Sequence, residues 1–205
     1  MAKQIEGVYE RILKCAKREF LKNGYADASL RTIAAQAKTS TNSIYVRFKD
    51  KEGLFEALVG KQYEHFMACF RKAQEDFTQL PPESQPDNLS SISGECMMEM
   101  LLYAYDNLDE FKLILCCAEG TRFAGMLDEM VEIETKGTHD YQAVLDGLGR
   151  PSPGIDPRLE HILITGMFNA YFELIIHEMP LEKAKTYLRE MRAFYTAGWM
   201  KIMGQ

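Results

Sequence analysis

One stretch near the N-terminus, residues 29–51, constrains the fold more than any other part of the chain. Its first half places four apolar side chains at the i, i+3, i+4, i+7 spacing of one buried helical stripe: Leu30, Ile33, Ala34 and Ala37. Ser29 precedes the stripe and can accept a hydrogen bond from the free N–H groups of the first turn. This pattern predicts a capped helix of about two turns.

The second half of the stretch repeats the pattern. Ser40 stands in a cap position, and Ile44 and Phe48 lie one helical turn apart. A helix this short is unstable alone because nucleation costs more than its few hydrogen bonds return, so it must pack on its neighbour. The pair predicts a helix-turn-helix whose second helix fits the major groove of DNA, which is about 12 Å wide.

A third helix before this stretch completes a small head. Its apolar side chains share one face, and Gly24 is placed to end it in the left-handed conformation. The predicted core of this head comprises Val8, Ile12, Phe20, Ile33, Ile44 and Phe48.

Hydrophobic, cap, aromatic and lysine positions in and around this stretch match the pattern of a known protein family. They are Phe20, Gly24, Tyr25, Ser29, Ile33, Ala34, Ser40, Ile44, Tyr45, Phe48, Lys51, Glu52 and Leu54. This set resembles the DNA-binding domain of the tetracycline-repressor (TetR) family of bacterial regulators over roughly the first fifty-five residues. The rest of the chain resembles the family only in length and helical character. The resemblance implies a homodimer that binds a palindromic operator.

Two residues depart from the family pattern. Lys38 stands where the family usually has a glycine in the turn, so either the turn avoids positive φ or Lys38 bears a strain of roughly 1 to 2 kcal/mol. Asn42 replaces a usual small residue on the exposed face, which bears on the operator sequence and leaves the expected fold unchanged.

Charge is divided unevenly along the 205 residues. The net charge is −6, yet residues 1–51 hold 11 Lys and Arg against 5 Asp and Glu, and residues 52–205 hold 13 against 25. A basic head on an acidic body suits phosphate binding while the body is repelled from the duplex. The alternative for the head is a solvated lysine-rich helix, which the helix-turn-helix pattern makes the weaker interpretation.

Cysteine usage and hydropathy indicate a cytoplasmic protein. The five cysteines have no metal-type pair spacing, and no export signal begins the chain, which favours reduced thiols: Cys15, Cys69, Cys96, Cys116 and Cys117. The longest uncharged stretch, residues 162–172, is shorter than the roughly 18 to 20 residues that a bilayer requires, so no membrane partner is expected.

The whole chain is predicted to be all-α with about nine helices. The proposed domains are a helix-turn-helix DNA-binding domain over residues 1–50 and a helical effector-binding and dimerisation domain over residues 51–205. All seven prolines lie beyond residue 80, and those at 81, 82, 86, 151, 153, 157 and 180 divide the body into blocks. We expect a long helix over residues 51–80, then helices around residues 95–105, 110–117 and 123–141, and a final helical hairpin.

The final hairpin carries a candidate dimer face. Its members are apolar or small: Leu159, Ile162, Gly166, Ala170, Leu188, Met191, Tyr195 and Gly198. Two such hairpins can form a four-helix bundle between copies, or these faces can pack only within one subunit. The resemblance favours a homodimer.

Candidate DNA contacts lie on the two short helices. They are Ser29, Arg31, Thr41, Asn42, Ser43, Tyr45, Arg47 and Lys51. Arginine can donate two hydrogen bonds to guanine, and Asn42 can pair with adenine. Tyr45 and Lys51 match family positions that touch phosphate. The alternatives are that Tyr45 is partly core and that Arg47 pairs with an acidic neighbour, Asp50 or Glu52.

The body supplies aromatic and soft side chains for an apolar effector cavity with a few polar groups. The candidates are Tyr103, Phe111, Cys116, Phe123, Met126, Tyr141, Met167, Phe168 and Tyr171. The same residues also describe an ordinary packed core. The effector is unknown and expected to be partly apolar, and no cofactor is implied.

Rival functions have weaker sequence signals. His139-Asp140 and Cys116-Cys117 lack any nucleophile elbow, phosphate loop or nucleotide fingerprint, so we expect no enzyme. The four histidines are scattered, and no metal site is expected. The prediction is a ligand-responsive repressor. The alternatives are a ligand-binding protein or enzyme with a vestigial head, or a thiol-based redox sensor.

Overall fold

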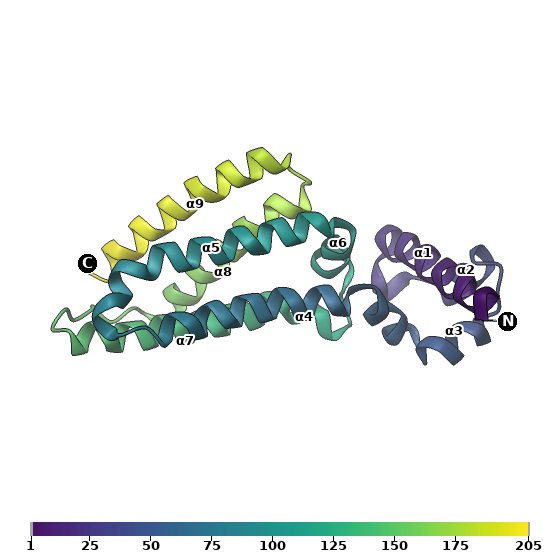
Figure 1. The fold of residues 1–205 in the computed structure, drawn as a ribbon, viewed down its shortest axis with the longest axis horizontal. Coiled ribbons are helices and arrows are strands. Elements are labelled where there is room, and N and C mark those ends of the chain that lie inside the picture. The colour runs from purple at the N-terminus through teal and green to yellow at the C-terminus, as the bar shows by residue number, and fades with distance from the viewer. Residues whose placement is uncertain (1, 205) are drawn as a thin grey trace. The chain divides into compact units, whose positions relative to one another are not determined.

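The computed structural model describes the backbone of residues 2–204 and the side chains of residues 7–204. Over this range the chain forms nine α-helices and two short 3₁₀ helices, which confirms the all-α prediction (Figure 1). Contacts divide it into two compact units. Unit 1 runs up to His65 and includes Asn107–Ala124, and unit 2 comprises Phe66–Asp106 and the chain from Gly125 onward.

Unit 1 begins with α1 (Ala2–Asp27), α2 (Leu30–Gln36) and α3 (Thr41–Phe48). The predicted head core is buried at Ile12, Phe20, Ile33, Ile44 and Phe48, while Val8 is half-buried. Gly24 has φ 71° and ψ 171°, a backbone conformation open to glycine; it interrupts the helical geometry of α1, but the helix continues to Asp27 and does not end at Gly24 as predicted. The helix-turn-helix therefore packs on α1 through one continuous apolar core.

The turns on either side of α3 are strained. Lys38 has φ 53°, so of the two alternatives for this turn the structure shows the strained one. Lys49 has φ 69° and ψ −53°, and the Asp50 N–H donates to the Phe48 carbonyl at 2.9 Å, which closes a γ-turn. This turn connects α3 to α4 (Lys51–Thr78), which the Asp50 carboxylate caps by accepting from Gly53 N–H at 2.7 Å.

A later segment of the chain also belongs to unit 1. It contains α6 (Leu108–Cys117) and most of the 3₁₀ helix η2 (Arg122–Gly125). Lys17 of α1 pairs with Glu110 at 2.5 Å, and Phe123 packs edge-on against Tyr63 of α4. The compact units thus do not follow a single cut at residue 50, and the functional division into residues 1–50 and 51–205 remains a proposal.

Unit 2 holds the rest of α4, the 3₁₀ helix η1 (Pro82–Ser84), α5 (Gln85–Asp106), α7 (Met126–Gly147), α8 (Pro157–Ile176) and α9 (Leu181–Ile202). Pro86 was expected to break the chain but lies in the first turn of α5, where a missing N–H costs nothing. Helix α5 therefore begins ten residues earlier than the core of the predicted helix at 95–105.

Helix α8 is long and apolar enough, by composition, to cross a membrane. It contacts α5, α7 and α9 inside unit 2, and its buried side chains include Ile164, Phe168 and Phe172. These contacts identify α8 as a core helix of unit 2.

Gly53→Ala should destabilise unit 1, because a Cβ at this position would collide with the Phe48 carbonyl oxygen. We expect a loss of about 1 to 3 kcal/mol in the free energy of unfolding, measured by urea denaturation. The control is Gly7→Ala in α1, where the nearest atom to a new Cβ is 3.6 Å away and stability should hold or rise. Equal stabilities of the two variants would contradict this role of Gly53.

Candidate functional site

Helices α2 and α3 are both fixed at their N-termini by serine caps, as predicted. Ser29 Oγ accepts from Thr32 N–H at 3.3 Å, and Ser40 Oγ accepts from Ser43 N–H at 3.2 Å. The buried Glu19 carboxylate adds a second restraint by accepting from the Ser29 N–H at 3.1 Å. Each short helix therefore has a side-chain acceptor for one of the free N–H groups of its first turn.

One face of α3 is buried and the opposite face is open. Ile44 and Phe48 point into the head core, where Phe48 stacks on Tyr9 with ring centroids 5.2 Å apart. Asn42, Tyr45 and Val46 are exposed and share the outer face by their i, i+3, i+4 spacing. We call these three residues the outer face of α3. Tyr45 is 50% exposed, which makes it a surface residue more than a core one.

The two arginines among the predicted DNA contacts differ in their hydrogen bonds within the protein. Arg31 in α2 is exposed, and no hydrogen bond or ion pair is recorded for it within residues 7–204. Arg47 is half-buried, and its Nη1 donates to the Ser43 carbonyl at 2.9 Å and to Ser43 Oγ at 2.7 Å. Arg47 thus bonds its own helix and not Asp50 or Glu52, the alternative partners that the sequence suggested.

Lys51, at the start of α4, has a partner inside the protein. Its Nζ donates to the Ala26 carbonyl at 2.9 Å and lies 4.8 Å from the centre of the Tyr25 ring. Desolvation lowers the pKa of Lys51, and the carboxylates of Asp27 and Glu19 oppose that shift. The ammonium group keeps two further N–H donors for another partner.

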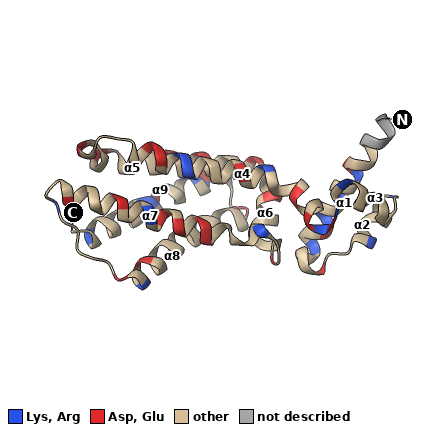
Figure 2. Cartoon of the chain, turned by 90° about the horizontal axis from the view of Figure 1, so that it is seen from below, with Lys and Arg blue, Asp and Glu red and all other residues tan. Residues whose placement is uncertain are grey.

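The remaining predicted DNA contacts are less exposed. Ser29, Thr41 and Ser43 are half-buried. Sequence reasoning did not select Val46, which is 74% exposed. The sequence could have indicated that Val46 is exposed, because it lies about 200° around the helix from Ile44, away from the buried stripe. Figure 2 shows the lysines and arginines of α1 to α3 in blue.

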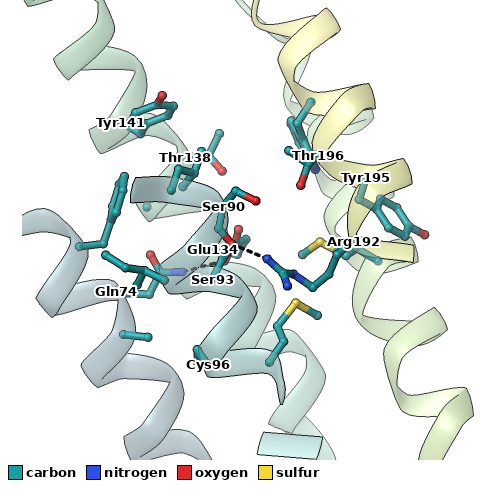
Figure 3. Close-up of a pocket in the computed structure, with 18 of the residues that line it drawn as sticks. Gln74, Ser90, Ser93, Cys96, Glu134, Thr138, Tyr141, Arg192, Tyr195 and Thr196 are labelled. Atoms are coloured by element: carbon teal, nitrogen blue, oxygen red, sulfur yellow. Dashed lines mark hydrogen bonds between the residues drawn. The ribbon is translucent and has the colours of Figure 1, made fainter. Parts of the chain in front are cut away.

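Unit 2 encloses a cavity of about 150 Å³ lined by α4, α5, α7, α8 and α9. Half of its lining residues are aromatic or sulfur-containing: Phe70, Phe77, Cys96, Met97, Tyr141, Met167, Phe168, Met191, Tyr195, Trp199, Met200 and Met203. Gln74, Glu134 and Arg192 supply the strongest polar groups, as Figure 3 shows. The cavity thus offers a soft apolar wall with two charged side chains.

Three of the nine predicted effector residues line this cavity, namely Tyr141, Met167 and Phe168. The other six lie elsewhere: Phe111, Cys116 and Phe123 in unit 1, and Tyr103, Met126 and Tyr171 in unit 2 outside the lining. Sequence reasoning missed Gln74, Glu134 and Arg192, because a polar residue on an amphipathic helix gives no sign that it faces a cavity.

The candidate dimer face is only partly open. Leu159 and Ile162 of α8 are 46% and 63% exposed, and Phe194 of α9 is 74% exposed. A Cβ at Gly166 or Gly198 would meet nothing within 4 Å, so a second backbone could approach there.

Other members of the predicted dimer face are less exposed. Leu188 is fully buried, which removes it from a surface, whereas Met191 and Tyr195 are half-buried residues that also line the cavity. Ala170 is half-buried. The sequence missed Phe194 and Tyr187, both exposed aromatic residues of α9.

The residues that could serve a redox, catalytic or metal-binding function do not form a common site. Cys116 is exposed while Cys117 is buried, and burial raises the pKa of the Cys117 thiol. His139 Nε2 lies 3.0 Å from Oε2 of the buried Glu160. Within the described chain, no three potential metal ligands come together.

This arrangement defines a class: an all-α protein with a helix-turn-helix DNA-binding head. Residues 12–58 match the family described as bacterial regulatory proteins, tetR family. The HTH-type transcriptional regulator UidR of Escherichia coli K12 is 34% identical over 62 residues, which are 30% of this chain. The chain spans about a third, 32%, of the length of this curated relative.

Solved structures share the fold along nearly the whole chain. FadR from Bacillus subtilis, in complex with stearoyl-CoA, has a TM-score of 0.56 at 15% identity over 93% of this chain and 98% of its own. PfmR from Thermus thermophilus, a TetR family regulator, has a TM-score of 0.51 at 16% identity over 89% and 97%. Residues 12–58 therefore match the DNA-binding domain of the TetR family, as the sequence predicted, and the chain shares the overall fold of these solved structures.

Ser40→Ala should weaken α3 by removing its cap. The expected loss is about 1 kcal/mol in the free energy of unfolding, measured by urea denaturation. Ser40→Asp is the matched control, because a carboxylate restores the acceptor for Ser43 N–H and should recover most of the loss. If the two variants unfold alike, the hydrogen bond at Ser40 does not hold the helix.

Proposed function

We propose that this protein is a TetR-family repressor that binds a palindromic operator as a homodimer and releases it when a small molecule occupies unit 2. The observation that carries the DNA-binding part is the outer face of α3, whose Asn42, Tyr45 and Val46 are exposed on a helix that is capped by Ser40 and buried on its opposite side. A helix with this exposure can enter the major groove and present its side chains to base edges.

The proposed contacts follow from side-chain chemistry. Arg31 can donate two hydrogen bonds to guanine, and Asn42 can pair with adenine. Val46 adds an apolar contact for a thymine methyl group. Tyr45 and Lys51 bind phosphate, and the two Lys51 donors not used by Ala26 remain for that role. Further contacts to the DNA backbone come from Ser29, Thr41, Ser43 and Arg47.

The proposed dimer forms through the open parts of α8 and α9. Leu159, Ile162 and Phe194 leave large apolar side chains in water, which a second copy would cover. Small residues beside them, Gly166 and Gly198, allow close helix approach. A twofold axis through this face would pair the two heads with two half-sites about one DNA turn apart.

The proposed switch uses α4, which runs from unit 1 into unit 2 without interruption. An effector in the cavity that prefers one tilt of α4 would change the separation of the two heads. A hundredfold loss of operator affinity requires only about 2.7 kcal/mol of coupling, within the usual range for allostery. The operation of such a regulator on chromosomal DNA implies a cytoplasmic location.

Arg31→Ala should reduce affinity for the specific operator by about 1 to 3 kcal/mol and relax the preference at one base pair. Because no internal partner is recorded for Arg31 in the described chain, folding should be unaffected. The measurement is fluorescence anisotropy on a duplex selected from a random pool, at several salt concentrations. Arg158→Ala, an exposed arginine of α8, is the control. Unchanged affinity and base preference in Arg31→Ala would remove this residue from the interface.

Ile162→Glu and Phe194→Glu should each convert the dimer to monomer at micromolar concentration, because a carboxylate would be buried without a partner. Sedimentation equilibrium gives the molecular mass directly. Leu148→Glu replaces another exposed apolar residue, outside α8 and α9, and should leave the mass unchanged. A wild-type protein that sediments as a monomer would exclude the proposed dimer.

A further inference from the structure

The polar groups of the unit 2 cavity differ in how well the protein satisfies them. Glu134 of α7 accepts one hydrogen bond, from Gln74 Nε2 of α4 to its Oε2 at 2.7 Å. Within the described residues no other hydrogen bond or ion pair is recorded for this carboxyl group, so its Oε1 has no protein donor. Figure 3 shows Glu134 in the cavity wall with Gln74 beside it.

The backbone is shaped to hold this pair. Gly137, one turn after Glu134 on α7, faces Gln74, and a Cβ there would lie 2.5 Å from Gln74 Oε1. The absence of a side chain at Gly137 lets the Gln74 amide lie against α7 and donate to Glu134. The position of the carboxyl group is therefore fixed from two helices.

Arg192 of α9 is already engaged. Its Nη2 donates to the Ser90 carbonyl of α5, its guanidinium lies where a Cβ of residue 94 would be, and the negative charge of Glu95 favours its charged form. The cationic group of the cavity thus has internal partners, whereas the acidic group has none that carries positive charge. A ligand that supplies a cation would correct this imbalance.

The rest of the wall suits the apolar part of such a ligand. Phe70, Phe77, Tyr141 and Trp199 offer aromatic rings, which attract cations through their faces. Methionine side chains adapt to irregular shapes. An anionic ligand would bring a second negative charge near Glu134, and this repulsion opposes its binding.

We infer that the effector of the proposed regulator is a lipophilic amine, whose ammonium group pairs with the Glu134 carboxylate while its apolar part contacts the aromatic and methionine wall. This inference rests on the proposed function for the role of the cavity, and it specifies the chemical class of the ligand.

The protonation of Glu134 gives the binding a pH dependence. Desolvation raises the pKa of Glu134 to about 7, partly offset by the hydrogen bond from Gln74. The other titratable groups of the wall are Cys96 of α5, Tyr141 of α7, and Arg192 and Tyr195 of α9. Burial raises the pKa of Cys96 and of Tyr141, which keeps both neutral near pH 7. Between pH 6 and 8, Glu134 is the cavity group that changes charge.

The test compares three probes with one apolar frame: 4-tert-butylbenzylamine, 4-tert-butylbenzyl alcohol and 4-tert-butylbenzoate. Binding to the full chain without DNA is measured by isothermal titration calorimetry. At pH 8 the amine should bind roughly tenfold or more tightly than the alcohol, with the benzoate weakest. With a Glu134 pKa of about 7, amine affinity should fall about tenfold from pH 8 to pH 6, while alcohol affinity should not fall.

Glu134→Gln separates charge from cavity shape. This variant should lose the preference for the amine and its pH dependence but keep binding of the alcohol, which shows that the cavity is intact. Glu132→Gln, at an exposed glutamate of the same helix, should behave as wild type.

Equal binding of amine and alcohol by the wild type, preference for the benzoate, or unchanged amine binding by Glu134→Gln would each overturn the inference. Because no DNA is present, these failures would leave the DNA-binding proposal standing. Conversely, a failure to bind any operator would leave a measured preference for amines intact.

Discussion

The burial of Ile44 and Phe48 against α1 and α2 is the interaction on which the head of this protein depends. Helix α3 has eight residues, too few to persist in water without packing. Its rigidity therefore comes from two side chains, one serine cap and the stacking of Phe48 on Tyr9. Because these restraints occupy one face, the opposite face is left open, and an open face on a fixed helix is what base readout requires.

The two turns that flank α3 carry backbone strain. Lys38 and Lys49 both have positive φ on either side of the helix, although neither is glycine. Such conformations persist only where the surrounding structure determines them, and they occur often near functional elements. Both side chains are exposed and add a positive charge in the turns that flank α3, which glycine could not do. Charge near a phosphate backbone is a physical reason for lysine at these strained positions.

The head could be predicted from the sequence because its determinants are local. The caps at Ser29 and Ser40 precede stripes of the correct spacing, and Gly24 has the positive φ that its position suggested. The association of residues 107–124 with unit 1 was not foreseen, since it comes from contacts between distant parts of the chain, such as that of Lys17 with Glu110 across 93 positions of sequence. Pairings at that separation leave no periodic signal.

The residues that line the cavity could not be identified from amino-acid types alone. Aromatic and sulfur-containing side chains both fill cores and line cavities. The sequence therefore gives Phe111 and Met167 the same prediction, although only Met167 lines the cavity. Leu188 fits a dimer stripe by its spacing, yet it packs inward because α9 has two apolar faces. The polar groups that distinguish a binding cavity from a core, Glu134 and Arg192, converge only through the tertiary fold.

The most direct test of the central claim is a hydroxyl-radical footprint of the protein on DNA selected from a random duplex pool. The account predicts two protected patches on one face of the duplex, related by twofold symmetry, with centres about one helical turn or a multiple of it apart. A single protected patch, or uniform protection without sequence enrichment in the pool, would contradict a dimeric helix-turn-helix regulator.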